Sequence, residues 1–203
     1  MANTTSSSAD APMTVPGLTP DEGHQVGDLL QQRLHALNDL ALTLKHVHWN
    51  VVGPHFIGVH QMLDPQVEGV RAMVDVVAER MATLGVPPNG LAGALVKDRS
   101  WDDYAIMRAD ATAHLGALDL VYTGVIEDHR AAIGEVEEVD PVTEDLLVGQ
   151  TGELEQYQWF VRAHLQNTAG ELSVAGARTE EKAATKASRA ASSRRKSTAT
   201  KKS

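Results

Sequence analysis

The sequence predicts an all-α protein built on a four-helix bundle, with a short extra helix in the long connection between the second and third helices. Two observations carry this prediction. Four long segments repeat apolar side chains every three to four residues, which is the spacing of one face of a helix. No segment of any length alternates apolar and polar residues as a strand would. Four long helices with one long connection are typical of a bundle.

The first helix is predicted to begin at Thr19-Pro20-Asp21-Glu22, which supplies an N-cap, a first-turn proline and acids at the positive helix end. Two stripes follow to about Asn50, one of Leu30, Leu34, Leu37, Ala41, Leu44 and His48, the other of Leu29, Ala36, Leu40, Thr43 and Val47. A helix that is apolar on two sides is expected to be buried on two sides, within its own bundle and against another subunit. Gly53-Pro54 ends it.

A second helix is predicted from about Val59 to Leu84, with Pro65 as a possible kink. Ser100-Trp101-Asp102-Asp103 resembles an N-cap and predicts the start of either a short helix or the third main helix. The third helix is expected to extend over 114–139, and the fourth to follow the Asp140-Pro141 turn over 143–167.

Three regions are therefore expected: a disordered arm at 1–17, the bundle at 18–170 and a basic low-complexity tail at 171–203. The tail composition predicts a mobile segment without a core. Residues 176–203 carry nine Lys or Arg against two acids, while the other 175 residues carry nine basic and 25 acidic side chains. This asymmetry predicts cations as partners of the body and polyanions as partners of the tail.

The composition excludes several classes of protein. Cysteine is absent, which rules out disulfides, thiolate nucleophiles and Cys-based metal sites. The N-terminus does not resemble a signal peptide, and no stretch approaches the roughly 18 apolar residues of a membrane helix. Dinucleotide, P-loop and nucleophile-elbow motifs are also absent. We expect a cytoplasmic protein with no membrane partner.

Four of the nine histidines lie within residues 45–64. Helical neighbours two apart point about 200° away from each other, so His46 and His48 cannot serve one site. His60 and Asp64 are four apart, and so are Asp75 and Glu79, and each pair can offer two ligands to one metal. The two pairs share one face, but they are separated by about 16 Å along the axis.

Two copies of this helix, antiparallel across a two-fold axis, would bring the pair of one chain to the pair of the other. His48 could reach the same site from the first helix. Two imidazoles and three carboxylates without sulfur suit iron, manganese or zinc, and a carboxylate-rich site favours ferric iron. The alternatives are a solvated polar face of Asp64, Glu68, Arg71, Asp75 and Glu79, and a satisfied core histidine at 48.

The stretch "KHVHWNVVGPHFIGVHQMLDPQVEGVRAMVDVVAER" resembles the signature of the Dps family, the ferritin-like DNA-binding proteins from starved cells. The motif consists of His48-Trp49-Asn50, His60, Asp64, Asp75 and Glu79, and the similarity covers roughly residues 15–170. It implies a hollow dodecamer with two-iron ferroxidase centres between chains. There His48, His60 and Asp64 would meet Asp75 and Glu79 of the neighbour. Such proteins oxidise Fe(II), preferably with hydrogen peroxide rather than O2, and store ferric mineral.

Further roles are implied by the same resemblance. Trp49 could donate an electron to a stray oxidant, or be a core aromatic. Lys45 could pair with a site carboxylate, or be a surface lysine. Acids near the start of the fourth helix could line ion pores at three-fold axes, or be a generic acidic helix start: Asp140, Glu144, Asp145 and Glu153. His55, in a Gly/Pro loop, is interpreted as a surface histidine.

The tail cations predict sequence-independent DNA binding and a nucleoid-associated protein: Lys182, Lys186, Arg189, Arg194, Arg195, Lys196, Lys201 and Lys202. Aromatic residues and a base-reading helix are missing from this segment, and a solubilising tail is the alternative. A bacterioferritin-type store is disfavoured, because no Glu is followed by His three positions later. An architectural DNA-compacting protein with little ferroxidase activity is the remaining rival.

Overall fold

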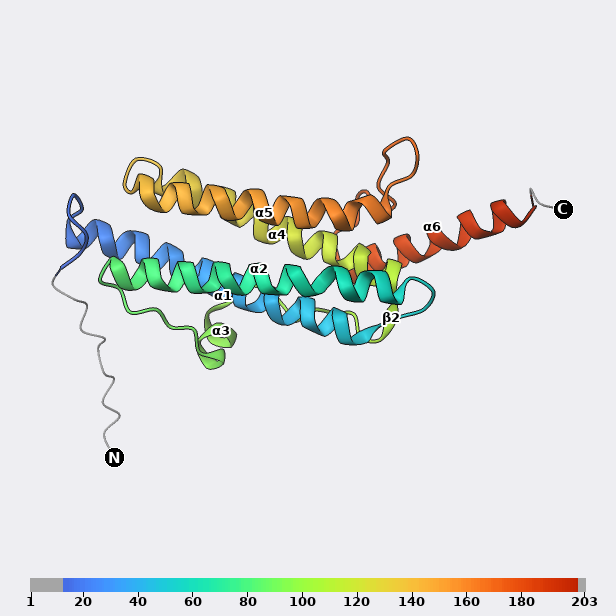
Figure 1. Cartoon of the computed structure of the whole chain (residues 1–203), viewed down its shortest axis with the longest axis horizontal. Helices are drawn as coiled ribbons and strands as arrows, with labels where there is room; N and C mark the ends of the chain where they lie inside the picture. The colour runs from blue at the N-terminus through green and yellow to red at the C-terminus, as the bar shows by residue number, and fades with distance from the viewer. Residues whose placement is uncertain (1–12, 201–203) are drawn as a thin grey trace, which may run out of the picture.

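The computed structural model describes residues 13–200, with side chains as far as Ser193. The four long helices are α1 (Pro20–Asn50), α2 (Phe56–Thr83), α4 (Ala111–Val136) and α5 (Pro141–Leu165). They lie side by side as two pairs, α1 with α2 and α4 with α5, and one hydrophobic core runs between them (Figure 1). The predicted all-α bundle is confirmed. The expected N-terminal arm falls mostly on residues 1–12, which lie outside the described residues.

The start and the two stripes of α1 are confirmed. Thr19 and Glu22 form a capping box, in which the Glu22 N–H donates to Thr19 Oγ1 at 3.3 Å and the Thr19 N–H donates to Glu22 Oε2 at 2.7 Å. Leu30, Leu37 and Leu44 on one stripe and Leu40 and Val47 on the other are all almost fully buried. α1 is thus enclosed on two sides within a single chain.

A short parallel ladder closes one end of the bundle. β1 (Val51–Val52) follows α1 directly and pairs with β2 (Ala109–Asp110), which precedes α4. Gly53 then adopts a φ of 94°, a left-handed conformation that a glycine reaches without steric cost, and the chain turns back into α2. α2 begins at Phe56, three residues before the predicted start, and continues through Pro65.

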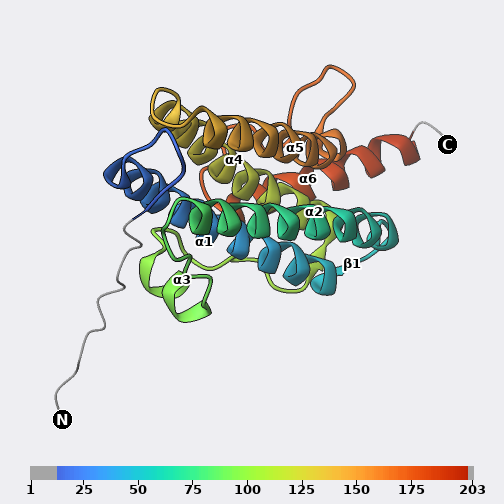
Figure 2. The ribbon, with the colours of Figure 1, turned by 60° about the vertical axis from the view of Figure 1, so that its left-hand side comes forward.

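The short extra helix of the long connection, α3 (Ala92–Asp98), precedes the residues that predicted it. Ser100 caps no helix, and the polar side chains on both sides of it bond to α1 and to the connection itself. Trp101 Nε1 donates to Asp39 Oδ2 at 2.7 Å, and Arg99 pairs with Asp103 at 2.5 Å. Figure 2 shows this connection running beside α1, with α3 standing away from the bundle.

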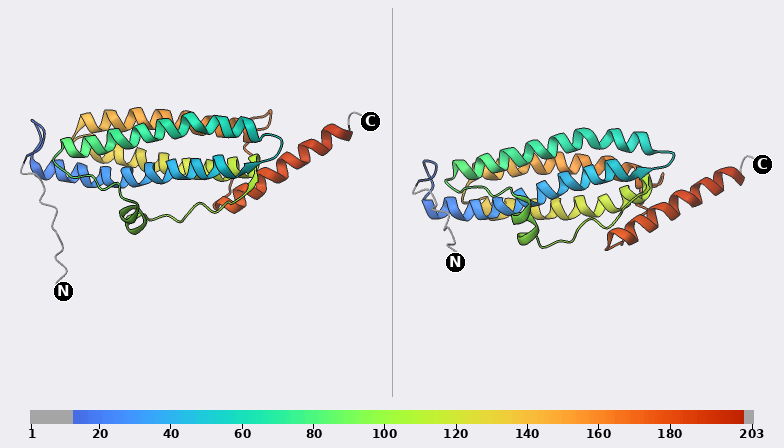
Figure 3. Two further views of the ribbon diagram at one scale, coloured as in Figure 1. Left: turned by 60° about the horizontal axis from the view of Figure 1, so that its bottom comes forward. Right: turned by 90° about the horizontal axis from the view of Figure 1, so that it is seen from below.

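The prediction of a mobile tail without a core is wrong for the described part of the segment. Residues Glu180–Thr200 form α6, and Ala183, Ala184 and Ala187 are buried against the bundle. A Cβ on Gly116 of α4 would lie 2.7 Å from the Ala183 carbonyl oxygen, which shows how closely the two helices approach. Beyond this contact α6 extends away from the four long helices (Figure 3). The alanines of this segment, which the composition classifies as low complexity, form the face of α6 that packs against the bundle.

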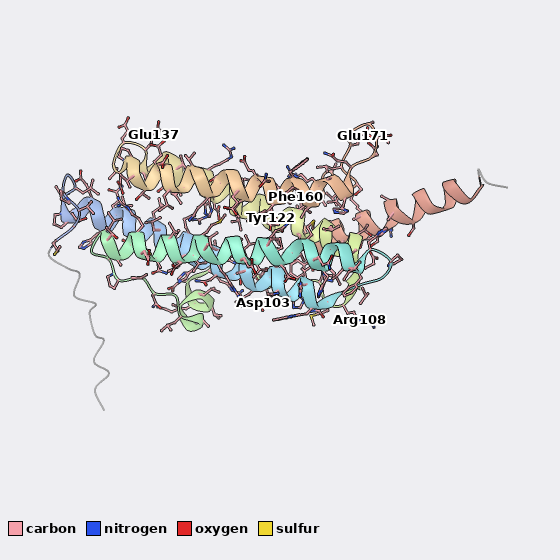
Figure 4. The ribbon with its side chains drawn as sticks, in the orientation of Figure 1. Asp103, Arg108, Tyr122, Glu137, Phe160 and Glu171 are labelled. Atoms are coloured by element: carbon pink, nitrogen blue, oxygen red, sulfur yellow. The ribbon has the colours of Figure 1, made fainter. Side chains whose placement is uncertain are left out.

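A buried tyrosine of α4 is paired with a polar group of α2. Figure 4 shows Tyr122 between the helices, with Asp103 and Arg108 on the long connection. The Tyr122 hydroxyl donates to Gln66 Oε1 at 2.7 Å, which satisfies a hydroxyl that is fully buried. Within the described residues, no helix has the length and apolar character needed to span a membrane.

Candidate metal centre

The turn between α1 and α2 brings the two predicted histidine ligands into contact. The His48 and His60 rings stack with centroids 3.6 Å apart. Nδ1 of His48 lies 2.9 Å from the His60 carbonyl oxygen, and Nδ1 of His60 lies 2.9 Å from the His48 carbonyl oxygen. A carbonyl oxygen only accepts, so Nδ1 carries the hydrogen on both rings. Each Nε2 then keeps its lone pair, as in histidines that bind metals.

Asp64, one turn after His60, adds a carboxylate next to the histidine pair. Its Oδ1 accepts from Lys45 Nζ at 2.7 Å and lies 3.3 Å from His48 Nδ1. The Lys45 hydrogen bond is the main reason why the pKa of Asp64 lies below its ordinary value. The carboxylate is therefore charged at neutral pH, and it is half exposed although Lys45 is paired with it. Lys45 thus pairs with Asp64, the carboxylate that the sequence predicts as a ligand, while the ligand role itself stays a prediction.

Asp75 and Glu79 lie further along α2 and are exposed in the single chain. Eleven residues of helix separate Asp75 from Asp64, a rise of about 16 Å. Across the described residues, no group of three or more His, Asp or Glu side chains is placed to hold one metal ion. The predicted five-residue ligand set can therefore close only if a second chain contributes part of it.

Large apolar side chains are exposed on α1 and at the start of α2. Trp49 is 72% exposed and Leu42, seven residues earlier on α1, is 62% exposed. Phe56 and Ile57 at the start of α2 are also exposed, and Phe56 tilts against the His60 ring. The alternative that Trp49 is a core aromatic of the chain is wrong. Exposed apolar side chains are candidates for a contact with another molecule, and Phe56 places one of them against the incomplete site.

The other two histidines within residues 45–64, His46 and His55, lie apart from this site. His46 faces the long connection, where its Nε2 lies 2.9 Å from the Ile106 carbonyl oxygen, as expected for a residue on another face of α1. His55 is exposed in the turn, as predicted.

The acids predicted for an ion pore have different surroundings. Asp140 is buried and accepts from Arg80 Nη2 and from Thr143 Oγ1, each at 2.5 Å, so its carboxylate holds the start of α5. Glu153 accepts from the Tyr157 hydroxyl. Glu144 is half-buried and Asp145 is exposed. Glu153 is exposed as well, so Asp140 is the one acid of the four that is enclosed, and the pore itself stays a prediction.

The predicted DNA-binding cations begin on the outer face of α6. Lys182, Lys186 and Arg189 are exposed, four and three residues apart, and so follow one face of the helix. Lys186 Nζ also donates to the Ala175 carbonyl oxygen at 2.7 Å. The side chains of Arg194, Arg195 and Lys196, and the whole of Lys201 and Lys202, lie outside the described residues.

Docking of α6 was not predicted, although the sequence held its signal. Glu180 Oε2 accepts from the Ala105 backbone N–H at 2.6 Å, and Ser188 Oγ donates to Asp110 Oδ2 at 2.9 Å. The alanines at 183, 184 and 187 have helical spacing, and two acids open the segment. This pattern, opposite the Lys182–Lys186–Arg189 face, indicates a helix packed on one side and charged on the other.

Comparison with known proteins agrees with this architecture. Residues 27–170 match the model of the ferritin-like domain, so the bundle defines a ferritin-like protein. The chain is 59% identical over 176 residues to the DNA protection during starvation protein of Mycolicibacterium smegmatis, which covers 87% of this chain and 96% of that protein. It is 55% identical over 163 residues to the fine tangled pili major subunit of Haemophilus ducreyi, covering 80% and 86%.

Solved structures give the same result. The tetragonal form of Mycobacterium smegmatis Dps aligns with a TM-score of 0.79 at 59% identity, over 81% of this chain and 99% of that one. DpsA14 from Streptomyces coelicolor aligns with a TM-score of 0.79 at 62% identity, over 80% and 97%. The chain belongs to the Dps family of ferritin-like proteins.

Proposed function

We propose that this protein oxidises Fe(II) with hydrogen peroxide, and less readily with O2, at centres shared between two chains. The ferric product is stored as mineral in a hollow dodecameric shell. The observation that carries this proposal is the stacked pair of histidines whose Nδ1 atoms are bound to backbone carbonyl groups, which leaves the lone pair of each Nε2 free for a metal ion, with the Asp64 carboxylate 3.3 Å from His48 Nδ1. Ferrous ions are the substrate, and each of two ions gives one electron to one peroxide molecule.

The protein's own groups account for binding and for charge. Imidazole nitrogen and carboxylate oxygen suit ferrous iron, and the carboxylates favour the ferric product. The stacked rings of His48 and His60 lock each other, so the ligands are held before iron arrives. Asp75 and Glu79 of a second copy would supply the missing carboxylates. The exposed apolar groups around Trp49 support a chain contact at this place.

The first test is anaerobic loading of the purified protein with Fe(II), followed by a peroxide pulse and recording of ferric absorbance. The His60→Ala/Asp64→Ala variant should lose fast oxidation. The His55→Ala/Glu68→Ala variant, which removes exposed polar groups of the same region, should retain it. Size-exclusion chromatography checks that both variants assemble as the parent does. Equal, slow rates in all three proteins would refute the proposal and leave the architectural DNA-compacting reading.

We also propose that the basic C-terminal segment binds DNA without reading its sequence. Clustered cations release counterions from the phosphate backbone, so affinity should fall steeply with salt. Copies of the segment on one shell would add avidity. The exposed face of Lys182, Lys186 and Arg189 supports this role, because the helix packs through its alanines and leaves these cations in solvent.

The test uses gel retardation at low salt. Deleting residues 176–203 should abolish retardation while iron oxidation continues. Because α6 is docked, a second variant keeps the packing alanines and changes Lys182, Lys186 and Arg189 to glutamine. Weaker retardation and a shallower salt dependence are expected from it. Unchanged retardation by the deletion variant would assign the segment a solubilising role instead.

A further inference from the structure

A cavity of about 560 Å³ lies between α1, α4, the long connection and the start of α6. Pockets of this size hold small organic molecules. Apolar side chains from the first three of these segments line it: Ala36, Leu40, Leu120, Val121, Val125 and Trp101. Residues 178–181 line it from the α6 side, so the cavity is complete only while α6 is docked. None of the predicted metal ligands contributes to the lining.

Thr43 of α1 is a buried polar residue in the lining of this cavity. It is 7% exposed, and its Oγ1 has no hydrogen-bond partner among the described residues. Thr83, Thr123 and Thr151, by contrast, each donate to the carbonyl oxygen four residues earlier in their own helix. Buried hydroxyl groups are normally hydrogen-bonded. The Thr43 hydroxyl is therefore available to a ligand that enters the cavity.

Carboxylates outnumber cations around the cavity. Six acids line it: Asp39, Asp102, Asp103, Asp128, Glu180 and Glu181. Arg178 also lines it, while Arg33 and Arg99 pair with members of the six from outside the lining. Six negative charges against these three positive charges leave a formal charge of −3. The cavity therefore attracts cations and repels anions.

The carboxylates influence one another most where α6 begins. Glu180 Oε2 accepts from the Ala105 N–H at 2.6 Å. Burial raises the pKa of the Glu180 carboxyl group, and the charges of Glu181 and Asp39 raise it further. A cation placed among these groups relieves both the burial of negative charge and the repulsion between neighbours.

The acids lie at two levels of the cavity, with apolar side chains between them. Arg33, which pairs with Asp128 at 3.5 Å, precedes Asp39 by six residues on α1, a rise of about 9 Å. Ala36 lines the cavity between these two levels. Across the residues that the structure describes, no three His, Asp or Glu side chains are placed to hold one metal ion. The negative charge thus has the spread of a long cation rather than of a single ion.

We propose that this cavity binds a linear aliphatic polyamine. One ammonium group donates to Asp39, Thr43 and Glu180, where the carboxylates influence one another most. A second ammonium group lies beside Asp128, and the methylene groups between the two cover the apolar lining. Ammonium groups only donate, while carboxylate and hydroxyl oxygens accept, so each polar group of the ligand meets a suitable partner.

Binding at this place is coupled to the docking of α6. The ligand contacts α1, α4 and the first turn of α6 together, so it binds the docked state and stabilises it. The basic end of the same chain is not the occupant, because α6 leads it away from the cavity (Figure 3). Thr200 lies about 30 Å along the helix from Glu180. The inference rests neither on the proposed iron chemistry nor on the proposed DNA contact.

The test is calorimetric titration of the full-length assembled protein with spermidine at physiological salt, which screens attraction to exposed acids. We expect saturable binding with one site per chain. Asp39→Asn/Glu180→Gln should weaken it by about tenfold. The matched control, Glu137→Gln/Glu138→Gln, removes the same charge at the exposed turn between α4 and α5 and should leave it unchanged. No saturable binding, or equal weakening by both variants, would overturn the proposal.

A second variant avoids the hydrogen bonds that hold the long connection, because Asp39 takes part in them. Thr43→Val keeps the shape of the side chain and every carboxylate, and should weaken spermidine binding by about three- to tenfold. Unchanged affinity would refute the assigned role of the hydroxyl and with it the proposed pose. Two competitors complete the test. Displacement of spermidine by an equal charge of Mg²⁺ would reduce the site to a general acidic surface, and tighter binding of a peptide of residues 191–203 would assign the cavity to a second copy of this chain.

Discussion

Replacing Gly116 by alanine tests whether α6 is held against α4 by close backbone approach. The new Cβ would lie 2.7 Å from the Ala183 carbonyl oxygen and 2.9 Å from the Ala187 Cβ, whereas ordinary contact begins at 3.4 Å. The oxygen belongs to the α6 backbone, so no side-chain rotation relieves the clash. Either α6 shifts by roughly 0.7 Å along this contact or it leaves α4.

The expected cost follows from overpacking, which destabilises a packed contact by about 1–3 kcal/mol. The matched control is Gly124→Ala on the same helix, where an added Cβ meets no atom within 4 Å. Both changes gain the helix propensity of alanine, up to about 1 kcal/mol, and this gain cancels in the comparison. The docked state of α6 should therefore be weaker in the Gly116 variant by about five- to hundredfold.

Limited trypsin digestion with intact-mass detection measures this difference. Cleavage after Lys182, Lys186 and Arg189 requires α6 to open, and its rate follows the open population when reclosing is fast. Cleavage at these three sites should be faster in Gly116→Ala than in Gly124→Ala by the factor given above. Equal rates in both variants and the parent would refute docking through Gly116.

Three further changes follow from single contacts. Since the pKa of His129 is lowered from 6.5 to about 4, the unfolded chain binds a proton below pH 6.5 that the folded chain does not. Stability should fall by roughly 3 kcal/mol between pH 6.5 and 4, and His129→Gln should remove this slope in urea unfolding at each pH. Lys45→Met should free Asp64 from its ion pair and tighten anaerobic Fe(II) binding by up to about fivefold, measured by titration, while Lys45→Arg should not. Trp101→Phe loses the hydrogen bond to Asp39 and should cost about 1–3 kcal/mol by urea unfolding; a change below that range would assign the bond no role in holding the long connection.

The sequence predicted the bundle because its signals are local. The Thr19–Glu22 capping box and the two stripes of α1 depend on spacing within one helix, and both are confirmed. His48 and His60 could be predicted to lie near each other as candidate ligands, but their reciprocal carbonyl bonds could not be predicted, because these bonds depend on how tightly β1 and Gly53 turn the chain. Residue spacing fixes which face a side chain occupies, and tertiary geometry fixes which of its atoms is free.

The errors share a physical cause as well. Ser100 to Asp103 has the composition of a helix start, yet Arg99, Trp101 and Asp103 are used in hydrogen bonds that involve α1 and the connection itself. Helix N-caps and tertiary hydrogen bonds use the same polar side chains. Composition alone therefore cannot tell which of the two a residue will form. The short helix α3 lies instead at Ala92–Asp98, before these residues.

The C-terminal segment shows the same limit of composition, because it was predicted to be mobile and instead forms a packed helix. Alanine buries little surface, so a helix of alanines and cations has too small an apolar face to be recognised as part of a core. Gly116 changes this balance, because the absence of a side chain there lets the α6 backbone approach α4 and gain contacts that alanine alone would not reach. A glycine in one helix and three alanines in another, 67 to 71 residues apart, are thus one packing unit. Docking fixes where the cationic face starts, and so the proposed DNA contact begins at a defined place on the bundle.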